Sequence, residues 1–228
     1  MPAARLAGVP LRAAMLDLDG TLVDTLGDFL AALRGMLGEL GLGDVTPQQV
    51  AQRVGKGSEH LVAQVLRLHL SGAEADALQQ HALETYQRHY ARINAEHSTV
   101  FPGVMQGLER LRAAGLALAC VTNKPGLHAR ELLRRKGLLD YFAQVAGGDA
   151  FARKKPDPLP LLRTCEQLGA PPSQVLMVGD SQNDAAAAAA AGCPAALATY
   201  GYNHGEPIRA CRALVYFDRL DRLPLQFA

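Results

Sequence analysis

Two aspartates one residue apart, Asp17 and Asp19, follow an apolar run over residues 13–16. The run is typical of a buried strand, and Gly20 permits a sharp turn just after the two acids. Because side chains alternate along a strand, both carboxylates face the same side. Buried carboxylates this close repel each other, and a divalent cation with oxygen ligands would relieve the repulsion. Taken alone, the pair fits an ordinary surface turn equally well.

A second polar edge follows the apolar run over residues 116–121, which also predicts a buried strand. Thr122 and Asn123 come directly after it. A hydroxyl and free backbone N–H groups at such an edge can hydrogen-bond a phosphoryl oxygen. Capping of the helix expected after Pro125 would explain Thr122 as well.

Further charged residues come later in the chain. Lys155 lies in a Lys-Lys-Pro sequence, which by itself is typical of a solvated charge cluster. The apolar run over residues 175–178 predicts another strand, which is followed by Gly179 and Asp180. Asp184 comes one helical turn later, so both acids face one side if a helix starts there. Either acid alone could be a helix N-cap.

The string Asp-Leu-Asp-Gly-Thr-Leu-Val-Asp over residues 17–24 resembles the first motif of the haloacid dehalogenase superfamily, most of whose members are phosphatases. Thr122, Lys155 and Asp180 match its other three motifs in order. The resemblance implies an α/β fold, with a Rossmann-like parallel sheet flanked by helices and an inserted α-helical cap. The segment over residues 199–206 is similar to one in bacterial phosphoglycolate phosphatases, which implies hydrolysis of 2-phosphoglycolate. Phosphatases of the superfamily that act on sugar phosphates, such as N-acetylmuramate 6-phosphate, carry similar segments and are the alternative.

The resemblance also implies a role for each acid. Asp17 would be the nucleophile that forms an aspartyl-phosphate, and Asp19 the acid and base that serves the leaving group and then the water. Mg²⁺ would be bound by Asp17, the backbone carbonyl of Asp19 and Asp180. Asp184 would orient a metal-bound water or Lys155.

The remaining site residues would hold the substrate. Thr122, the Asn123 backbone N–H and Lys155 would bind the phosphoryl oxygens. Lys56, framed by Gly55 and Gly57, would bind the substrate carboxylate from the cap, although a plain loop with a solvated lysine is an equally good explanation.

The intervening sequence predicts the elements that position these residues. Apolar residues at three-four spacing from Leu26 to Leu40, a Thr46-Pro47 helix start and two further periodic stretches, 61–69 and 78–93, predict a helical cap over residues 25–96. Residues 1–24 and 97–228 form the predicted α/β core, in which helices and short apolar strands alternate. All four motifs lie at strand ends, where the ligand crevice of a parallel sheet is found.

Composition narrows the class of partner. The 228 residues carry a net charge of +1 without a run of Lys or Arg, so we expect a small phosphorylated metabolite rather than nucleic acid or a membrane. Four widely spaced cysteines, the lack of a signal peptide and the lack of a long apolar span predict a cytoplasmic protein. We expect a monomer or a homodimer. A receiver-like module that accepts a phosphoryl group is the non-enzymatic alternative, but it would lack Asp19 and the helical insertion.

Overall fold

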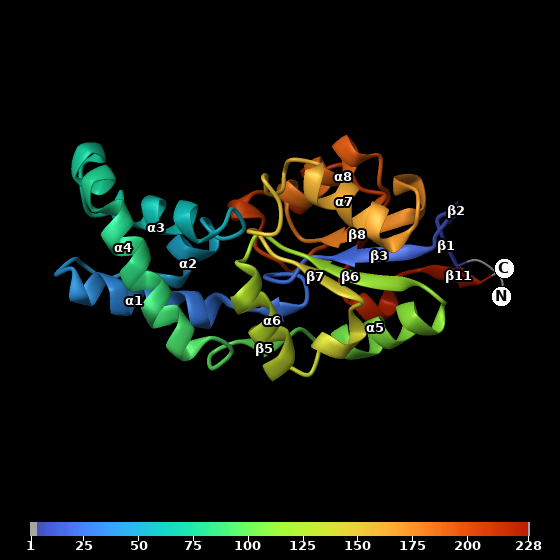
Figure 1. Ribbon diagram of the computed structural model, residues 1–228, viewed down its shortest axis with the longest axis horizontal. Helices are drawn as coiled ribbons and strands as arrows, with labels where there is room; N and C mark the ends of the chain where they lie inside the picture. Colours follow the sequence, from blue (N-terminus) through green and yellow to red (C-terminus); the bar gives the residue numbers. More distant parts are fainter. Residues whose placement is uncertain (1–3, 228) are drawn as a thin grey trace.

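A six-stranded sheet, parallel at every pairing, forms the centre of the molecule in the computed structural model, which describes residues 4–227 (Figure 1). Residues 1–3 and 228 of the predicted core lie outside the described residues. The strands are, in sheet order, β10 Val215–Phe217, β9 Ala195–Ala198, β8 Val175–Gly179, β3 Ala13–Leu16, β6 Ala117–Val121 and β7 Gln144–Ala146. Three of them are the strands predicted before the first, second and fourth motifs.

Helices cover both faces of this sheet, because its parallel strands are connected through helices. On β3, Ala14 and Leu16 pack against α5 (Val104–Ala113) and α6 (Gly126–Arg135), while Met15 faces α7 (Leu159–Leu168) and α8 (Gln182–Ala191). The seven-alanine run forms most of α8, and Gly192 ends that helix in the left-handed conformation. Burial on both faces explains why the strands are continuously apolar. The predicted fold class is confirmed.

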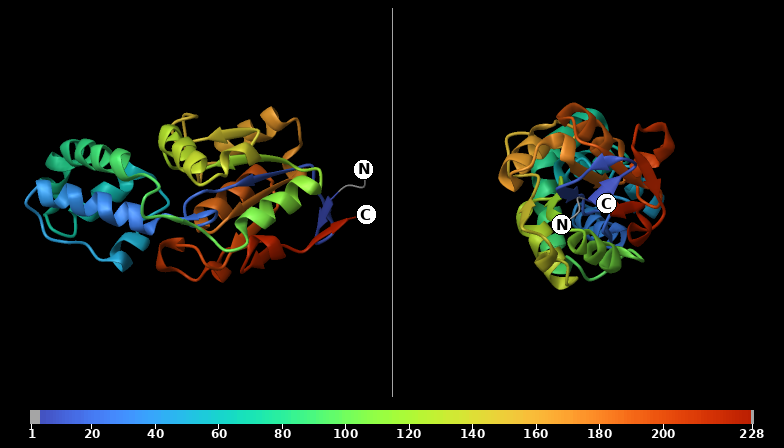
Figure 2. Two further views of the ribbon diagram at one scale, coloured as in Figure 1. Left: turned by 90° about the horizontal axis from the view of Figure 1, so that it is seen from below. Right: turned by 90° about the vertical axis from the view of Figure 1, so that its right-hand side faces the viewer.

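Four helices between residues 26 and 93 form a separate layer, which we call the helical cap. They are α1 Leu26–Glu39, α2 Pro47–Ala51, α3 Ser58–Leu66 and α4 Gly72–Ile93. The cap encloses its own apolar cluster, to which Leu33, Met36, Val62 and Tyr86 contribute. Figures 1 and 2 show the cap beyond the end of the sheet, joined to the core by two chain segments. The helix expected to include His69 ends at Leu66, because the chain then turns with short-range hydrogen bonds before α4 begins.

The two connections to the cap are tied together. β4 (Val23–Asp24) leaves the core and pairs antiparallel with β5 (Thr99–Val100), which returns to it. The buried Asp28 carboxylate accepts hydrogen bonds from the backbone N–H groups of Ala95 (2.9 Å) and His97 (2.7 Å). These bonds hold the start of α1 against the end of the cap, so the cap is anchored beside the sheet edge.

A small antiparallel sheet closes the opposite end of the core. Its strands are β11 Leu225–Phe227, β1 Ala4–Leu6 and β2 Val9–Pro10, and Figure 1 shows them far from the cap. Short 3₁₀ turns occupy Leu139–Tyr141, Pro172–Gln174, Asn203–Gly205, Ile208–Ala210 and Leu220–Arg222. Within residues 4–227, no helix combines the length and the apolar character needed to cross a bilayer.

Candidate active site

The carboxyl ends of three neighbouring strands bring the motif residues together. β8, β3 and β6 lie side by side, and they end immediately before Asp180, Asp17 and Thr122. The Asp17 N–H donates to the Val178 carbonyl at 2.9 Å, so the sheet register continues into the nucleophile candidate. All three side chains are buried. The predicted convergence at this edge follows from strands that start together and have similar lengths.

Lys155 forms ion pairs with two of the acids. Its Nζ donates to Asp184 Oδ1 and to the Val121 carbonyl, both at 2.7 Å, and lies 3.0 Å from Asp17 Oδ1. The Asn123 amide fixes the Lys155 backbone, accepting from its N–H at 3.0 Å and donating to its carbonyl at 2.8 Å. The Asn123 side chain therefore positions Lys155, a role that the sequence did not indicate.

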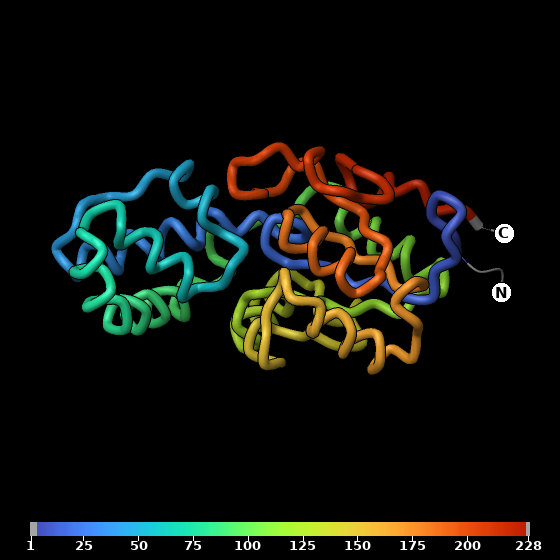
Figure 3. The backbone as a smooth tube through the Cα atoms, turned by 90° about the horizontal axis from the view of Figure 1, so that it is seen from above, coloured from blue at the N-terminus to red at the C-terminus, as the bar shows by residue number. Residues whose placement is uncertain are grey.

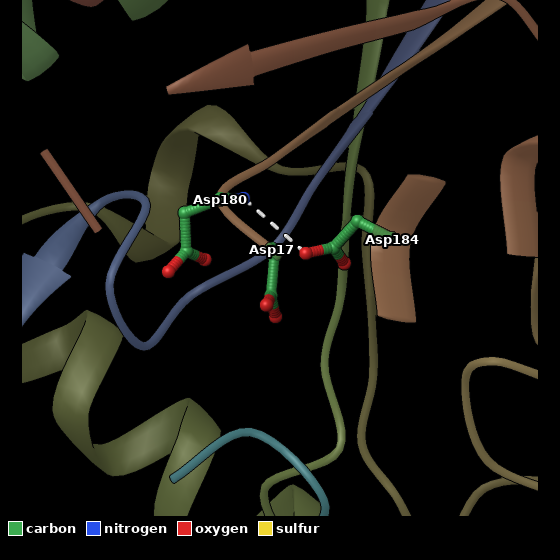
Figure 4. A group of neighbouring side chains, drawn as sticks. All are labelled: Asp17, Asp180 and Asp184. Atoms are coloured by element: carbon green, nitrogen blue, oxygen red, sulfur yellow. Dashed lines mark hydrogen bonds between the residues drawn. The ribbon is translucent and has the colours of Figure 1, made fainter. Parts of the chain in front are cut away.

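Asp184 has both carboxylate oxygens occupied by protein donors. Oδ1 accepts from Lys155, and Oδ2 accepts from the Ser181 hydroxyl at 2.7 Å and from the backbone N–H groups of Ser181 and Asp180. The last bond is the dashed line in Figure 4. Ser181 and Asp184 form a capping box at the start of α8. These partners suit Asp184 to orienting its neighbours.

Asp180 is held from the other side by residues distant in sequence. Its Oδ1 accepts from the Thr21 hydroxyl at 2.8 Å, and its Oδ2 accepts from the Tyr202 N–H at 2.7 Å. A Cβ atom on Gly20 or Gly201 would collide with the Asp180 carboxylate, so both glycines are needed for this close approach.

The site carries an excess of buried negative charge. Burial raises the pKa of Asp17 to about 7; Lys155 opposes this effect, and Asp184 and Asp19 add to it. Burial, then Asp184 and Asp17, also raise the pKa of Asp180. Burial disfavours the charged form of Lys155, yet the Asp17 and Asp184 carboxylates hold its pKa above the ordinary value. One ammonium is thus surrounded by more carboxylates than it can neutralise.

The acidic cluster fits a divalent cation. Asp17, Asp180 and Asp184 each offer an oxygen, and these three atoms lie within 4.8 Å of one another (Figure 4). Asp17 Oδ1 is buried without a hydrogen-bond donor among the described residues, although Lys155 lies at ion-pair distance. Carboxylate oxygens are the ligands of hard cations, and a cation would lower the repulsion among these groups. A divalent metal site is therefore compatible with this donor set.

Asp19 and Lys124 face a cavity between the core and the cap. Asp19 Oδ1 accepts from Lys124 Nζ at 2.9 Å, and both residues line the cavity together with Asp17 and Thr122. The cap side is mainly apolar and aromatic, with Phe29, Val54, Leu61, Tyr86 and Tyr90. A small molecule bound here would contact polar groups of the core on one side and apolar groups of the cap on the other.

Lys56 lies apart from the motif residues. It is exposed, whereas its neighbours Gly55 and Gly57 line the cavity, so the loop presents backbone rather than the lysine side chain to that space. The Gly55 carbonyl accepts from the amides of Asn123 (2.9 Å) and Asn183 (3.2 Å). This loop therefore joins the cap to the core directly above the second and fourth motifs.

Tyr202 connects the site to the entrance of the cap. Its hydroxyl accepts from the N–H groups of Thr25 (2.9 Å) and Leu26 (3.1 Å) and donates to Asp24 at 2.6 Å. The hydroxyl thus satisfies the free amides at the start of α1, where Thr25 makes no side-chain cap. In Figure 3 the C-terminal segment that carries Tyr202 lies at the junction between cap and core. The sequence marked this segment only through its similarity to a subgroup.

Thr21 and Lys124 were overlooked in a different way. Thr21 lies within the first motif and Lys124 directly follows Asn123, but their partners, Asp180 and Asp19, are 159 and 105 residues away. Position within or beside a motif was the one available signal for either role.

Comparison with known proteins is consistent with this geometry. The family model for haloacid dehalogenase-like hydrolases matches residues 14–198, a range that includes all four motifs and the whole helical cap. The chain belongs to the haloacid dehalogenase-like hydrolases. The predicted resemblance is confirmed.

Relatives of this haloacid dehalogenase-like hydrolase extend the match over most of the chain. A phosphoglycolate phosphatase of Thiobacillus denitrificans is 42% identical over 200 residues, 88% of each chain. One of Nitrosospira multiformis is 44% identical over 209 residues, covering 91% of this chain and 92% of its own. The crystal structure of a predicted phosphoglycolate phosphatase from Haemophilus somnus superposes with a TM-score of 0.88 at 32% identity, covering 92% and 95% of the two chains.

Proposed function

We propose that this protein is a Mg²⁺-dependent phosphatase that hydrolyses 2-phosphoglycolate to glycolate and inorganic phosphate. The observation that carries the proposal is the 42–44% identity to phosphoglycolate phosphatases over about nine-tenths of the chain. The site supports it, because Asp17, Asp180 and Lys155 lie at one sheet edge, and Asp17 lines a cavity between core and cap.

Asp17 is the nucleophile in the first half of the reaction. Its carboxylate oxygen attacks phosphorus, the bond between phosphorus and the glycolate oxygen breaks, and an aspartyl-phosphate forms. Mg²⁺, held by Asp17, Asp180 and the Asp19 carbonyl, would supply positive charge that offsets repulsion between the carboxylate and the phosphoryl group. Lys155 adds a fixed positive charge 3.0 Å from Asp17. Thr122 and Asn123 line the cavity, where the Thr122 hydroxyl and the Asn123 N–H would hold phosphoryl oxygens.

Asp19 moves the protons in both halves. As a carboxylic acid it gives its proton to the departing glycolate oxygen, and as a carboxylate it then takes a proton from water. The hydroxide oxygen attacks phosphorus, the bond to Asp17 breaks, and inorganic phosphate leaves. Asp19 lines the same cavity as Asp17, so its carboxylate would be near the leaving oxygen of a substrate that Asp17 attacks.

The placement of the cysteines, none of which forms a disulfide, supports a cytoplasmic location. All four are free thiols, and three are buried. Free thiols persist in reducing compartments. We propose that the enzyme acts there as a monomer or homodimer, and gel filtration with light scattering would determine which.

A substrate panel tests the function. Purified protein is assayed for phosphate release from 2-phosphoglycolate, N-acetylmuramate 6-phosphate and several sugar phosphates, with Mg²⁺ or with EDTA. We expect the highest kcat/KM for 2-phosphoglycolate and loss of activity in EDTA. A higher kcat/KM for a sugar phosphate would overturn the substrate assignment and leave the phosphatase chemistry in place.

A further inference from the structure

Lys124 is a buried cation that the mechanism above does not use. Its side chain is 3% exposed, and its Nζ lies 2.9 Å from Asp19 Oδ1. The ammonium also lies over two aromatic rings of the cap, 4.5 Å from the centre of Phe29 and 4.7 Å from that of Tyr90. Such contacts stabilise a desolvated cation. A core lysine is therefore held in place by the cap, beside the proposed general acid.

Lys124 also carries the positive charge of the cavity wall. It is the only Lys or Arg among the described residues that line this cavity. His128 lines it too, but burial and the Lys124 charge lower the pKa of its imidazole, which leaves it neutral near pH 7. Lys155 is occupied by Asp17 and Asp184, and Lys56 is exposed outside the lining.

The covalent structure of 2-phosphoglycolate places its carboxylate near this ammonium. The general acid must lie within about 3 Å of the leaving oxygen to protonate it. In 2-phosphoglycolate the carboxylate oxygens are three bonds from that leaving oxygen, which is a separation of roughly 3 Å. The Lys124 ammonium, which is ion-paired with Asp19, is therefore within reach of a carboxylate at this position.

We propose that Lys124 selects substrates with a carboxylate on the carbon that bears the phosphate, by exchanging its ion pair with Asp19 for one with that carboxylate. This inference rests on the proposed function, and it identifies the residue that recognises the carboxylate of the proposed substrate. The exchange frees Asp19 to carry the proton that the leaving oxygen needs. A substrate without the carboxylate leaves Lys124 paired with Asp19.

The wall around Lys124 is suited to a small anion. The rings of Phe29 and Tyr86 each stack on the Tyr90 ring, with ring centres 5.7 Å apart in both pairs. Burial, with the Asp19 and Asp28 carboxylates, raises the pKa of the Tyr90 phenol, which therefore stays protonated. Its buried hydroxyl has no hydrogen-bond partner among the described residues, so a donor is free for a carboxylate oxygen. The apolar rings offer little to the many hydroxyl groups of a sugar.

The test compares 2-phosphoglycolate with 2-hydroxyethyl phosphate, in which a hydroxymethyl group replaces the carboxylate. Both have alkoxide leaving groups, so any effect that acts only through Asp19 changes both alike. Lys124→Met should lower kcat/KM for 2-phosphoglycolate by about 10- to 100-fold, the range of a charge-assisted contact, and for 2-hydroxyethyl phosphate by less than about 3-fold. Lys124→Arg should restore part of the preference. Lys56→Met is the matched variant, because it removes the rival lysine.

Equal losses on both substrates in Lys124→Met would overturn the proposal, as would a loss of preference in Lys56→Met alone. Circular dichroism and turnover of p-nitrophenyl phosphate establish that each variant folds, and Lys124→Gln replaces Lys124→Met if that variant does not. Wild-type enzyme that prefers 2-phospholactate would refute the proposed substrate, while the Lys124 variants would still test carboxylate selection. Wild-type enzyme that is indifferent to the carboxylate would refute both.

Discussion

Removal of the divalent metal should make the stability of this protein depend on pH in an unusual direction. Without a divalent cation, Asp17 and Asp184 share the ammonium of Lys155, and Asp180 lies beside them in the same buried site. Partial protonation is then the way to reduce the repulsion. The folded state should therefore hold a proton that the unfolded state has released.

The structure gives the size of this effect. The pKa of Asp17 rises from 3.8 to about 7, chiefly through burial. The contribution of Asp17 to the free energy of unfolding is therefore fully present below its unfolded-state pKa. It is lost as the pH rises through its folded-state pKa. At about 1.4 kcal/mol per pKa unit, the loss between about pH 5.5 and about pH 8 is on the order of 2 kcal/mol. The pKa of Asp180 is also raised, so its contribution has the same sign.

Urea unfolding at the two pH values, in EDTA and in excess Mg²⁺, measures the effect. We expect the metal-free protein to be less stable at the higher pH. Mg²⁺ should stabilise it more there, because metal ligands must be deprotonated. Groups that titrate elsewhere in the chain contribute equally in EDTA and in Mg²⁺, so their effect cancels when the two pH dependences are subtracted.

Asp180→Asn supplies the control. The substitution removes one buried carboxylate, so it should increase metal-free stability near pH 8 and abolish stabilisation by Mg²⁺. The reasoning fails if the wild-type protein shows the same pH dependence in EDTA as in Mg²⁺, or if the variant keeps the full response to the metal.

Three further substitutions test separate parts of the site. Asp17→Asn should reduce turnover to below about 1% in a phosphate-release assay, because an amide cannot form the aspartyl-phosphate, and higher activity without deamidation would contradict the assignment. Asp19→Asn should slow hydrolysis of 2-phosphoglycolate by roughly 100-fold or more but affect p-nitrophenyl phosphate less, since nitrophenolate needs no proton; equal losses in single-turnover phosphorylation would exclude the acid role. Asn183→Ala should raise KM several-fold by removing one of the two amides that bind Gly55, and an unchanged KM would show that Asn123 alone holds the loop.

Local sequence was sufficient for most elements. The apolar runs before Asp17, Thr122 and Asp180 predicted β3, β6 and β8, and three-four spacing predicted α1 and α4. The strands β4 and β5 escaped prediction, because each has two residues and exists through its pairing with the other. Such short pairs have no periodicity of their own.

The placement of lysines needed the tertiary structure. From the sequence, Lys56 was the candidate for the carboxylate, because glycines frame it, and the structure places it at the surface. Lys124 had no such signal. The burial of Lys124 depends on Phe29 of α1 and Tyr90 of α4, which are distant in the sequence of the cap. Their rings lie together over the ammonium when the cap packs against the core.

The sequence by itself determined the fold class, the strand ends that carry the motifs and the identity of the acids, because all of these follow from patterns within about ten residues. The tertiary structure decided which side chain pairs with each buried carboxylate. Lys155 with Asp184, Thr21 with Asp180 and Lys124 with Asp19 are contacts across 29 to 159 residues. Burial and charge at such sites depend on packing between elements, which no local pattern records.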